Sequence, residues 1–164
     1  MDAFVIDGFE FCRLKERREG SFAIAELVRL SEELADRSGT LHWSLQGSVD
    51  ALGHARLLLS VTATVQLMCQ RCLTPFAFDV ATASSLLLAR NDDEADEIDA
   101  MLDEEGVDVI VGARAMAMLD LIEDEALLAL PFSAKHPVCP DQVDLAEASG
   151  NVKLSPFAVL KGKQ

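Results

Sequence analysis

Apolar residues recur at helical spacing near the start of the chain and alternate with polar residues over its middle. Between residues 22 and 37 four apolar side chains repeat at the period of a helix, with Ser21 as a possible N-cap and Gly39 beyond the end. These four are Ile24, Leu27, Leu30 and Leu34. The spacing predicts a short amphipathic helix near the amino terminus.

Longer segments after this helix carry the pattern of strands. Residues 41–49 alternate apolar and polar side chains, and residues 55–69 are rich in Leu, Val and Thr. Turn-forming residues at 50–54 separate the two segments, which predicts an antiparallel hairpin. Residues 76–90 predict a third strand, and the sequence VDVIV at 107–111 predicts a short buried one.

An acidic segment lies between the last two strands. Residues 91–105 hold nine carboxylates and no basic residue. Their mutual repulsion, with few apolar side chains to bury, predicts a mobile acidic loop. The alternative is a phosphate-like surface that docks on a basic ribosomal or nucleic-acid-binding protein.

A long amphipathic helix is predicted over residues 114–131, where Pro131 ends it. Its pattern places Asp120, Glu123 and Asp124 on the polar side, but Glu125 in the middle of the apolar face. The apolar arc comprises Ala117, Met118, Leu119, Leu121, Ile122, Ala126, Leu128 and Ala129.

A charged carboxylate at Glu125 would need a partner, because an unpaired charge in the core costs several kcal/mol. We expect an arginine, with Arg71 as the first candidate, in an ion pair that fixes the helix on the sheet. Acid catalysis would need a second positioned group, which the sequence does not indicate.

These elements predict an α+β fold. We expect a strongly twisted antiparallel sheet or small open barrel between residues 41 and 111, with one long helix packed on it and the amino-terminal helix closing one side. The length of 164 residues fits a single domain over residues 1–164.

The formal net charge of −14 bears on the partners. A chain this acidic should bind nucleic acid poorly through its overall field, which favours basic proteins as partners. Positive charge gathers only near the start and in a basic tail over about residues 151–164, and these ends either contact phosphate or are simply solvated. Without a long apolar run or a secretory pattern, we expect a cytoplasmic protein that has no membrane partner.

Two pairs of possible metal ligands have short spacings. Cys69 and Cys72 lie at the corner between two predicted strands, and His136 and Cys139 follow the long helix. Together they make a complete donor set for structural zinc, which requires that the two segments meet in space. Buried reduced thiols and a redox pair are the other interpretations, although the helix that activates thioredoxin-like pairs is not predicted here. No phosphate-binding, dinucleotide-binding or nucleophile-elbow motif occurs, so we expect neither an enzyme nor a small-molecule substrate.

Three stretches resemble, in order and spacing, the bacterial YceD family of large ribosomal RNA subunit accumulation proteins. They are CQRCLTPF at 69–76, DLIEDEALLALPFSAKHPVC at 120–139 and SPFAVLKGKQ at 155–164. The resemblance implies a binding role for Arg71, Pro75, Glu123, Asp124, Glu125, Pro156 and Phe157. Some relatives have a cysteine-richer ending, whereas this chain has only Cys139 there, with His136 as a possible substitute.

The resemblance also implies a non-catalytic factor in ribosome biogenesis that supports accumulation of large-subunit ribosomal RNA. Its expected partner is a large-subunit precursor particle, contacted through a ribosomal protein, the ribosomal RNA or both. The net charge of −14 makes docking through protein contacts the favoured route. The alternative is an acidic interaction module that sequesters a basic protein unrelated to the ribosome.

Overall fold

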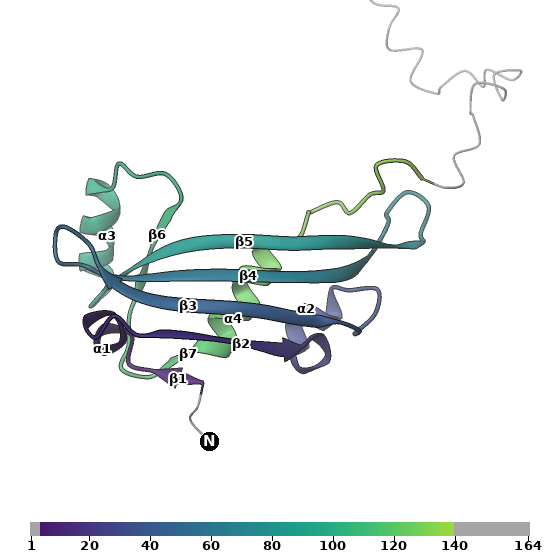
Figure 1. Ribbon diagram of the computed structural model, residues 1–164. Helices are drawn as coiled ribbons and strands as arrows, with labels where there is room; N and C mark the ends of the chain where they lie inside the picture. Colours follow the sequence, from purple (N-terminus) through teal and green to yellow (C-terminus); the bar gives the residue numbers. More distant parts are fainter. Residues whose placement is uncertain (1–3, 140–164) are drawn as a thin grey trace, which may run out of the picture.

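The computed structural model describes residues 4–139, which form an open sheet with helices packed against it (Figure 1). None of the helices in this range is both long and apolar enough to cross a bilayer. The elements are, in order, β1 (Val5–Ile6), α1 (Gly8–Arg13), β2 (Arg17–Ala23), η1 (Ile24–Glu26), α2 (Val28–Glu32), β3 (Thr40–Val49), β4 (Ala55–Met68), β5 (Pro75–Ala89), α3 (Asp92–Met101), β6 (Val107–Val111), β7 (Met116–Ala117) and α4 (Met118–Leu128).

The main sheet has five strands in the order β2-β3-β4-β5-β6. Strands β2 to β5 are antiparallel neighbours, whereas β6 pairs with the end of β5 in parallel. A parallel pair needs a crossover connection, which α3 supplies. The short strands β1 and β7 form a separate antiparallel pair.

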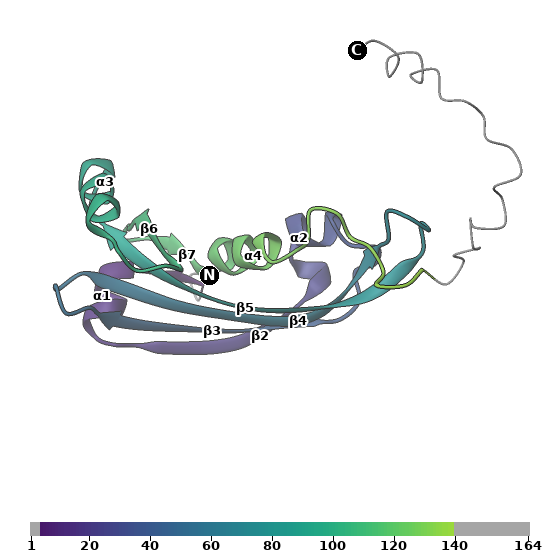
Figure 2. The ribbon, with the colours of Figure 1, turned by 90° about the horizontal axis from the view of Figure 1, so that it is seen from above.

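Over most of its length one face of the sheet is buried and the other is open to solvent. Along β4, Leu57, Leu59 and Val61 are buried, while the alternating Ser60 and Thr62 are exposed. The sheet curves around α4, and α2 lies on the same side (Figure 2). Because side chains alternate across a strand, this pattern places α4 and α2 on the concave face. Helix α3 packs on the opposite face, against Leu87 and Ala89 at the end of β5.

The predicted strands and hairpin are confirmed, and the sheet is open. The strand at 107–111, predicted to be buried, is only partly so. Two parts of the sheet's topology were not predicted: the parallel position of β6 and the edge strand β2. In β2 only Phe22 is buried, so the strand has no alternating pattern that sequence could reveal.

The predicted helix over residues 22–37 is wrong in most of its length. Phe22 and Ala23 end β2, a 3₁₀ turn follows, and α2 spans only Val28–Glu32. Ile24, Leu27 and Leu30 do enter the core. Their spacing of three residues suits a 3₁₀ turn as well as an α-helix, and strand pairing of β2 with β3 decides the outcome.

The predicted acidic loop is also wrong, since α3 occupies residues Asp92–Met101. Asn91 caps this helix by accepting a hydrogen bond from the Glu94 N–H at 2.8 Å. Ile98 is buried in a cluster with Leu87 and Ala89 of β5. Acidic residues in the first turn are favoured by the helix dipole, so the carboxylates are compatible with a helix here.

The predicted long helix is shorter than expected and turned differently. Residues Met116–Ala117 pair with β1, so α4 starts at Met118. Its buried line is Met118, Ile122 and Ala126, whereas Leu128 is 83% exposed. Glu123, predicted on the polar side, is only 5% exposed.

Candidate metal centre

Two segments far apart in sequence meet at one end of the sheet, where β4 turns into β5. The corner is closed by backbone hydrogen bonds from Cys69 to Thr74 (3.0 Å) and from Leu73 to Cys69 (2.9 Å). The Gln70 N–H donates to the carbonyl of Ala134 at 2.8 Å and so holds the segment after α4 against the corner. The meeting of the two segments, which a four-ligand site requires, is confirmed.

The four predicted ligand atoms converge. The Sγ atoms of Cys69, Cys72 and Cys139 and a ring nitrogen of His136 all lie within 4.8 Å of one another. Cys69 Sγ is 3.8 Å from Cys139 Sγ, and Cys72 Sγ is 3.3 Å from His136 Nδ1. In a tetrahedral site with Zn–S bonds of about 2.3 Å, two sulfurs are about 3.8 Å apart, so this cluster fits such a metal.

The fold prepares Cys69 as a thiolate. Burial alone raises the pKa of its thiol, but backbone N–H groups of Cys72, His136 and Arg71 and the His136 side chain lower the pKa to about 5. The His136 N–H lies 3.4 Å from Cys69 Sγ. Burial and the neighbouring sulfurs of Cys69 and Cys72 raise the pKa of Cys139 to about 11. Adjacent sulfurs therefore resist joint ionisation, and a cation between them removes that repulsion.

The surroundings of the cysteines differ from those of a redox pair. Cys69 and Cys72 lie between two strands, β4 and β5, as the sequence predicted. Activated redox cysteines are typically found at a helix N-terminus, where the helix dipole favours a thiolate. The arrangement is that of a knuckle at a strand corner, which can hold a metal ion and thereby join two chain segments.

Glu123 and Asp124, two of the predicted binding residues, contact the first half of the chain. The carboxylate of Glu123 accepts hydrogen bonds from the Leu30 N–H at 2.9 Å and from Arg29 Nε at 3.1 Å. Asp124 pairs with Arg29 NH1 at 2.6 Å. These contacts join α4 to α2. Arg29 was not singled out from the sequence, because nothing near it signals a partner more than 90 residues away.

The predicted pairing of Glu125 with Arg71 is wrong. Glu125 accepts hydrogen bonds from the hydroxyls of Thr82 at 2.6 Å and Ser84 at 2.8 Å, both on β5. Arg71 instead lies exposed in the cysteine corner. Two hydroxyl donors satisfy a half-buried carboxylate without a cation, which is why an arginine is not required there.

A comparison with models of known protein families finds a match. A family model described as "Large ribosomal RNA subunit accumulation protein YceD" matches residues 57–162. The chain belongs to the YceD family. No solved structure matches the chain.

The match to the YceD family runs through the strand corner, α4 and the segment that carries His136 and Cys139. Arg71 and Pro75 are exposed at the corner, so a binding role for them stays a prediction. Pro156 and Phe157, also predicted from the YceD resemblance, lie outside the described residues. The family's description names large ribosomal RNA subunit accumulation and no catalytic activity.

Proposed function

We propose that the protein is a non-catalytic, cytoplasmic factor that supports accumulation of large-subunit ribosomal RNA by docking on a precursor of the large ribosomal subunit. The observation that carries this proposal is the match of the YceD family over residues 57–162. The acidity of the chain supports docking through basic ribosomal proteins, which carry charge opposite to its net −14.

The docking surface that charge favours is the outer side of α3. Asp92, Asp93, Asp96, Glu97 and Asp99 are exposed there, while Ile98 anchors the inner side to β5. A helix presents such carboxylates at fixed spacing, which a mobile loop would not do. This rigid row of negative charge suits a basic protein surface.

Sedimentation tests the proposal. A tagged protein expressed from its own promoter is separated on a sucrose gradient at low magnesium, and each fraction is probed for the protein and for large-subunit precursor RNA. Comigration with the precursor is expected. Recovery at the top of the gradient, together with a basic partner unrelated to the ribosome, would instead identify a sequestering module.

A charge-matched pair of variants tests the role of α3. Asp96→Asn, Glu97→Gln and Asp99→Asn remove three carboxylates from its exposed side. Glu32→Gln, Glu33→Gln and Asp120→Asn remove three exposed carboxylates elsewhere. We expect the first variant to leave the precursor fractions and the second to remain. Equal behaviour of the two would show that α3 is not the docking surface.

We also propose that the centre made by Cys69, Cys72, His136 and Cys139 holds structural zinc. The three sulfurs and one imidazole are ligands that zinc prefers, and their closeness supports the assignment. The ion would fasten the segment after α4 to the β4–β5 corner. Zinc is not required by the docking proposal, so the two are tested separately.

A further inference from the structure

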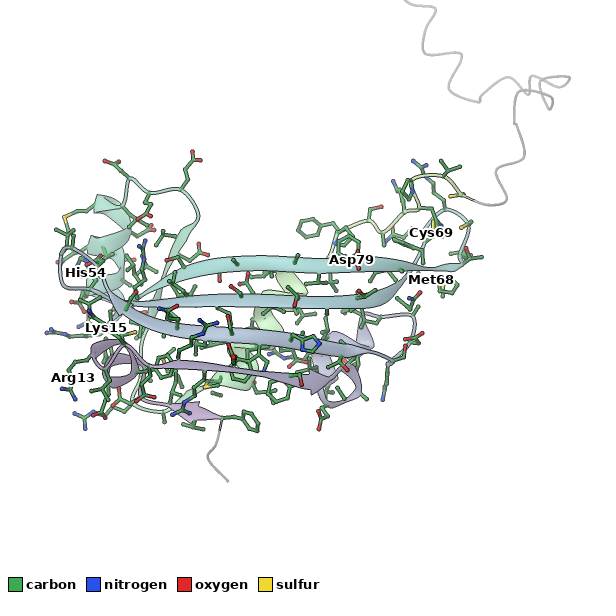
Figure 3. The ribbon with its side chains drawn as sticks, in the orientation of Figure 1. Arg13, Lys15, His54, Met68, Cys69 and Asp79 are labelled. Atoms are coloured by element: carbon green, nitrogen blue, oxygen red, sulfur yellow. The ribbon has the colours of Figure 1, made fainter. Side chains whose placement is uncertain are left out.

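A second polar site lies at the end of the sheet opposite the cysteines, where Figure 3 labels Arg13 and Lys15 far from Cys69. It is a cleft of about 640 Å³ between α1 and the segments next to α3 and β7. The side chains on its wall that bear on binding are Asp7, Phe9, Glu10, Arg13, Arg90 and Arg114. Three arginines in one cleft are unexpected in a chain of net charge −14.

The arginines come from three segments that backbone hydrogen bonds hold together. The Gly8 N–H at the start of α1 donates to the carbonyl of Ala113, next to Arg114, at 3.1 Å. The Gly112 N–H donates to the carbonyl of Ala89, next to Arg90, at 2.8 Å. A Cβ at Gly112 would lie 2.8 Å from the Phe9 ring, so α1 packs closely on this connection. The backbone that lines the cleft is therefore held in place by these hydrogen bonds and by packing.

The two acidic groups of the cleft are already engaged. Asp7 caps α1 and accepts hydrogen bonds from the N–H groups of Phe9 and Glu10, both at 3.1 Å. Glu10 pairs with Arg13 at 3.0 Å. Within residues 4–139, Arg90 and Arg114 form no ion pair. Both are exposed, so their guanidinium groups are available to an external anion.

We propose that this cleft binds phosphate groups of an RNA backbone. A guanidinium group presents a planar fork of N–H donors that matches phosphate oxygens, and it stays charged at all physiological pH values. The regular, dense phosphates of RNA can contact neighbouring guanidinium groups together, which the irregular carboxylates of an acidic peptide do less well. The contact is local, which reconciles RNA binding with an overall negative charge.

The position of the cleft next to the acidic helix α3 supports RNA as its ligand. The backbone N–H of Arg90 donates to the carboxylate of Glu94 in α3 at 2.6 Å, so the Arg90 side of the cleft adjoins the acidic helix. A ribosomal precursor presents basic protein and RNA phosphate side by side, and these two adjoining surfaces of opposite charge fit such a composite partner. The inference rests on the proposed function in this respect, and it names the surface that contacts RNA.

Fluorescence anisotropy with the full chain tests the cleft. The probe is a fluorescein-labelled RNA duplex of about 20 base pairs, long enough to present phosphates on both strands to one protein. Titrations run between about 50 and 200 mM KCl, so that the salt slope reports the phosphate contacts made. We expect the double variant Arg90→Ala/Arg114→Ala to bind about tenfold more weakly or worse, with a salt slope smaller by about two.

The matched control removes two positive charges elsewhere. Arg37 and Lys135 are exposed, and Arg37→Ala/Lys135→Ala changes the net charge by the same two units. We expect this control to bind within about twofold of the wild type, since its phosphate contacts are intact. Thermal melting verifies that both variants are folded, and Arg90→Lys/Arg114→Lys should recover part of the affinity.

Two results would overturn the inference: no binding of the duplex by the wild type at the lowest salt, or equal loss in the cleft variant and its control. Neither result touches the proposed function. A protein that fails to bind naked RNA and still comigrates with the precursor would retain protein-mediated docking and lose only the cleft.

Discussion

Glu123 of α4 accepts the Leu30 N–H of α2 at 2.9 Å and so caps a helix from 93 residues away. Helix α2 starts at Val28, and the residue in its N-cap position, Leu27, has no side chain that can accept a hydrogen bond. The first N–H groups of a helix need acceptors from outside it. The buried carboxylate of Glu123 supplies one and, through Arg29, also fixes the two helices to each other.

Replacing Glu123 with Ala should therefore destabilise the protein. The Leu30 N–H would lose its acceptor in a buried place, which costs about 1–3 kcal/mol. Urea unfolding followed by far-UV circular dichroism measures the loss. Glu123→Gln should cost less, because an amide oxygen can still accept the hydrogen bond.

Asp120→Ala is the control for the Glu123 variants. Asp120 lies on the same helix, 69% exposed, with only a 3.9 Å approach to Arg29. Its removal should change the free energy of unfolding by about 0.5 kcal/mol or less. Equal losses at positions 120 and 123 would show that the cap contributes nothing.

Removal of a zinc ligand should empty the metal centre. We expect the purified protein to contain about one zinc per chain, as a four-ligand structural site does. Cys72→Ser should lose it, whereas Cys12→Ala should keep it, because Cys12 is buried at the other end of the sheet and donates to the Arg56 carbonyl. Elemental analysis gives the metal content, and chelation should lower the Tm of the wild type alone.

Cobalt(II) provides an independent readout of this centre. Bound to three thiolates and an imidazole, it gives the intense visible absorption of tetrahedral thiolate coordination. A wild type that takes up neither zinc nor cobalt would leave the cysteines as ordinary buried thiols.

Asp50 should make stability depend on pH in the acid range. Burial raises the pKa of its carboxyl, but hydrogen bonds from the backbone and ring of His54 and from the Leu52 N–H outweigh this and hold the pKa below its usual value. The unfolded state then binds a proton at a higher pH than the folded state does. This contribution to stability is present above the unfolded pKa and is lost as the pH falls through the folded pKa.

The measurement for Asp50 is urea unfolding of the wild type and Asp50→Asn from about pH 6 to pH 3, across the usual range of Asp titration. The advantage of the wild type over the variant should be largest at the upper end and shrink toward the lower. An advantage that stayed constant with pH would exclude a role for the charge of Asp50.

Contacts between residues close in sequence were mostly predictable, and contacts between distant ones were mostly not, with the cysteine corner as the exception. The hairpin of β3 and β4 follows from alternating side chains and a turn at 50–54, because register and pattern are local. The cysteine corner followed from ligand spacing. Glu123, rather than Glu125, is the buried carboxylate that pairs with an arginine. Glu125 does face the sheet, but it bonds to hydroxyls of β5. The rotation of α4 is set by these contacts rather than by the apolar pattern alone.

The edge strand β2 and helix α3 show two further limits. The residues of β2 that precede Phe22 are exposed and mostly polar, and this segment is a strand because it pairs with β3. In α3 one buried residue, Ile98, and the cap at Asn91 outweigh the repulsion among carboxylates. Composition predicted a loop because it counts charges and does not show which of them face water.

Gly47 is required where β3 passes α1, and Gly47→Ala should be destabilising. A Cβ there would lie 2.5 Å from the Phe11 carbonyl oxygen and 2.8 Å from the Cα of Cys12, both backbone atoms of a packed helix. Moving that helix costs about 1–3 kcal/mol, as overpacking of a core does. Gly20→Ala is the matched control, because its Cβ would approach only the Trp43 ring, at 3.1 Å, and a side chain can shift by a few tenths of an ångström. Urea unfolding should show the larger loss at position 47, and equal losses would mean that α1 yields as easily as a single side chain.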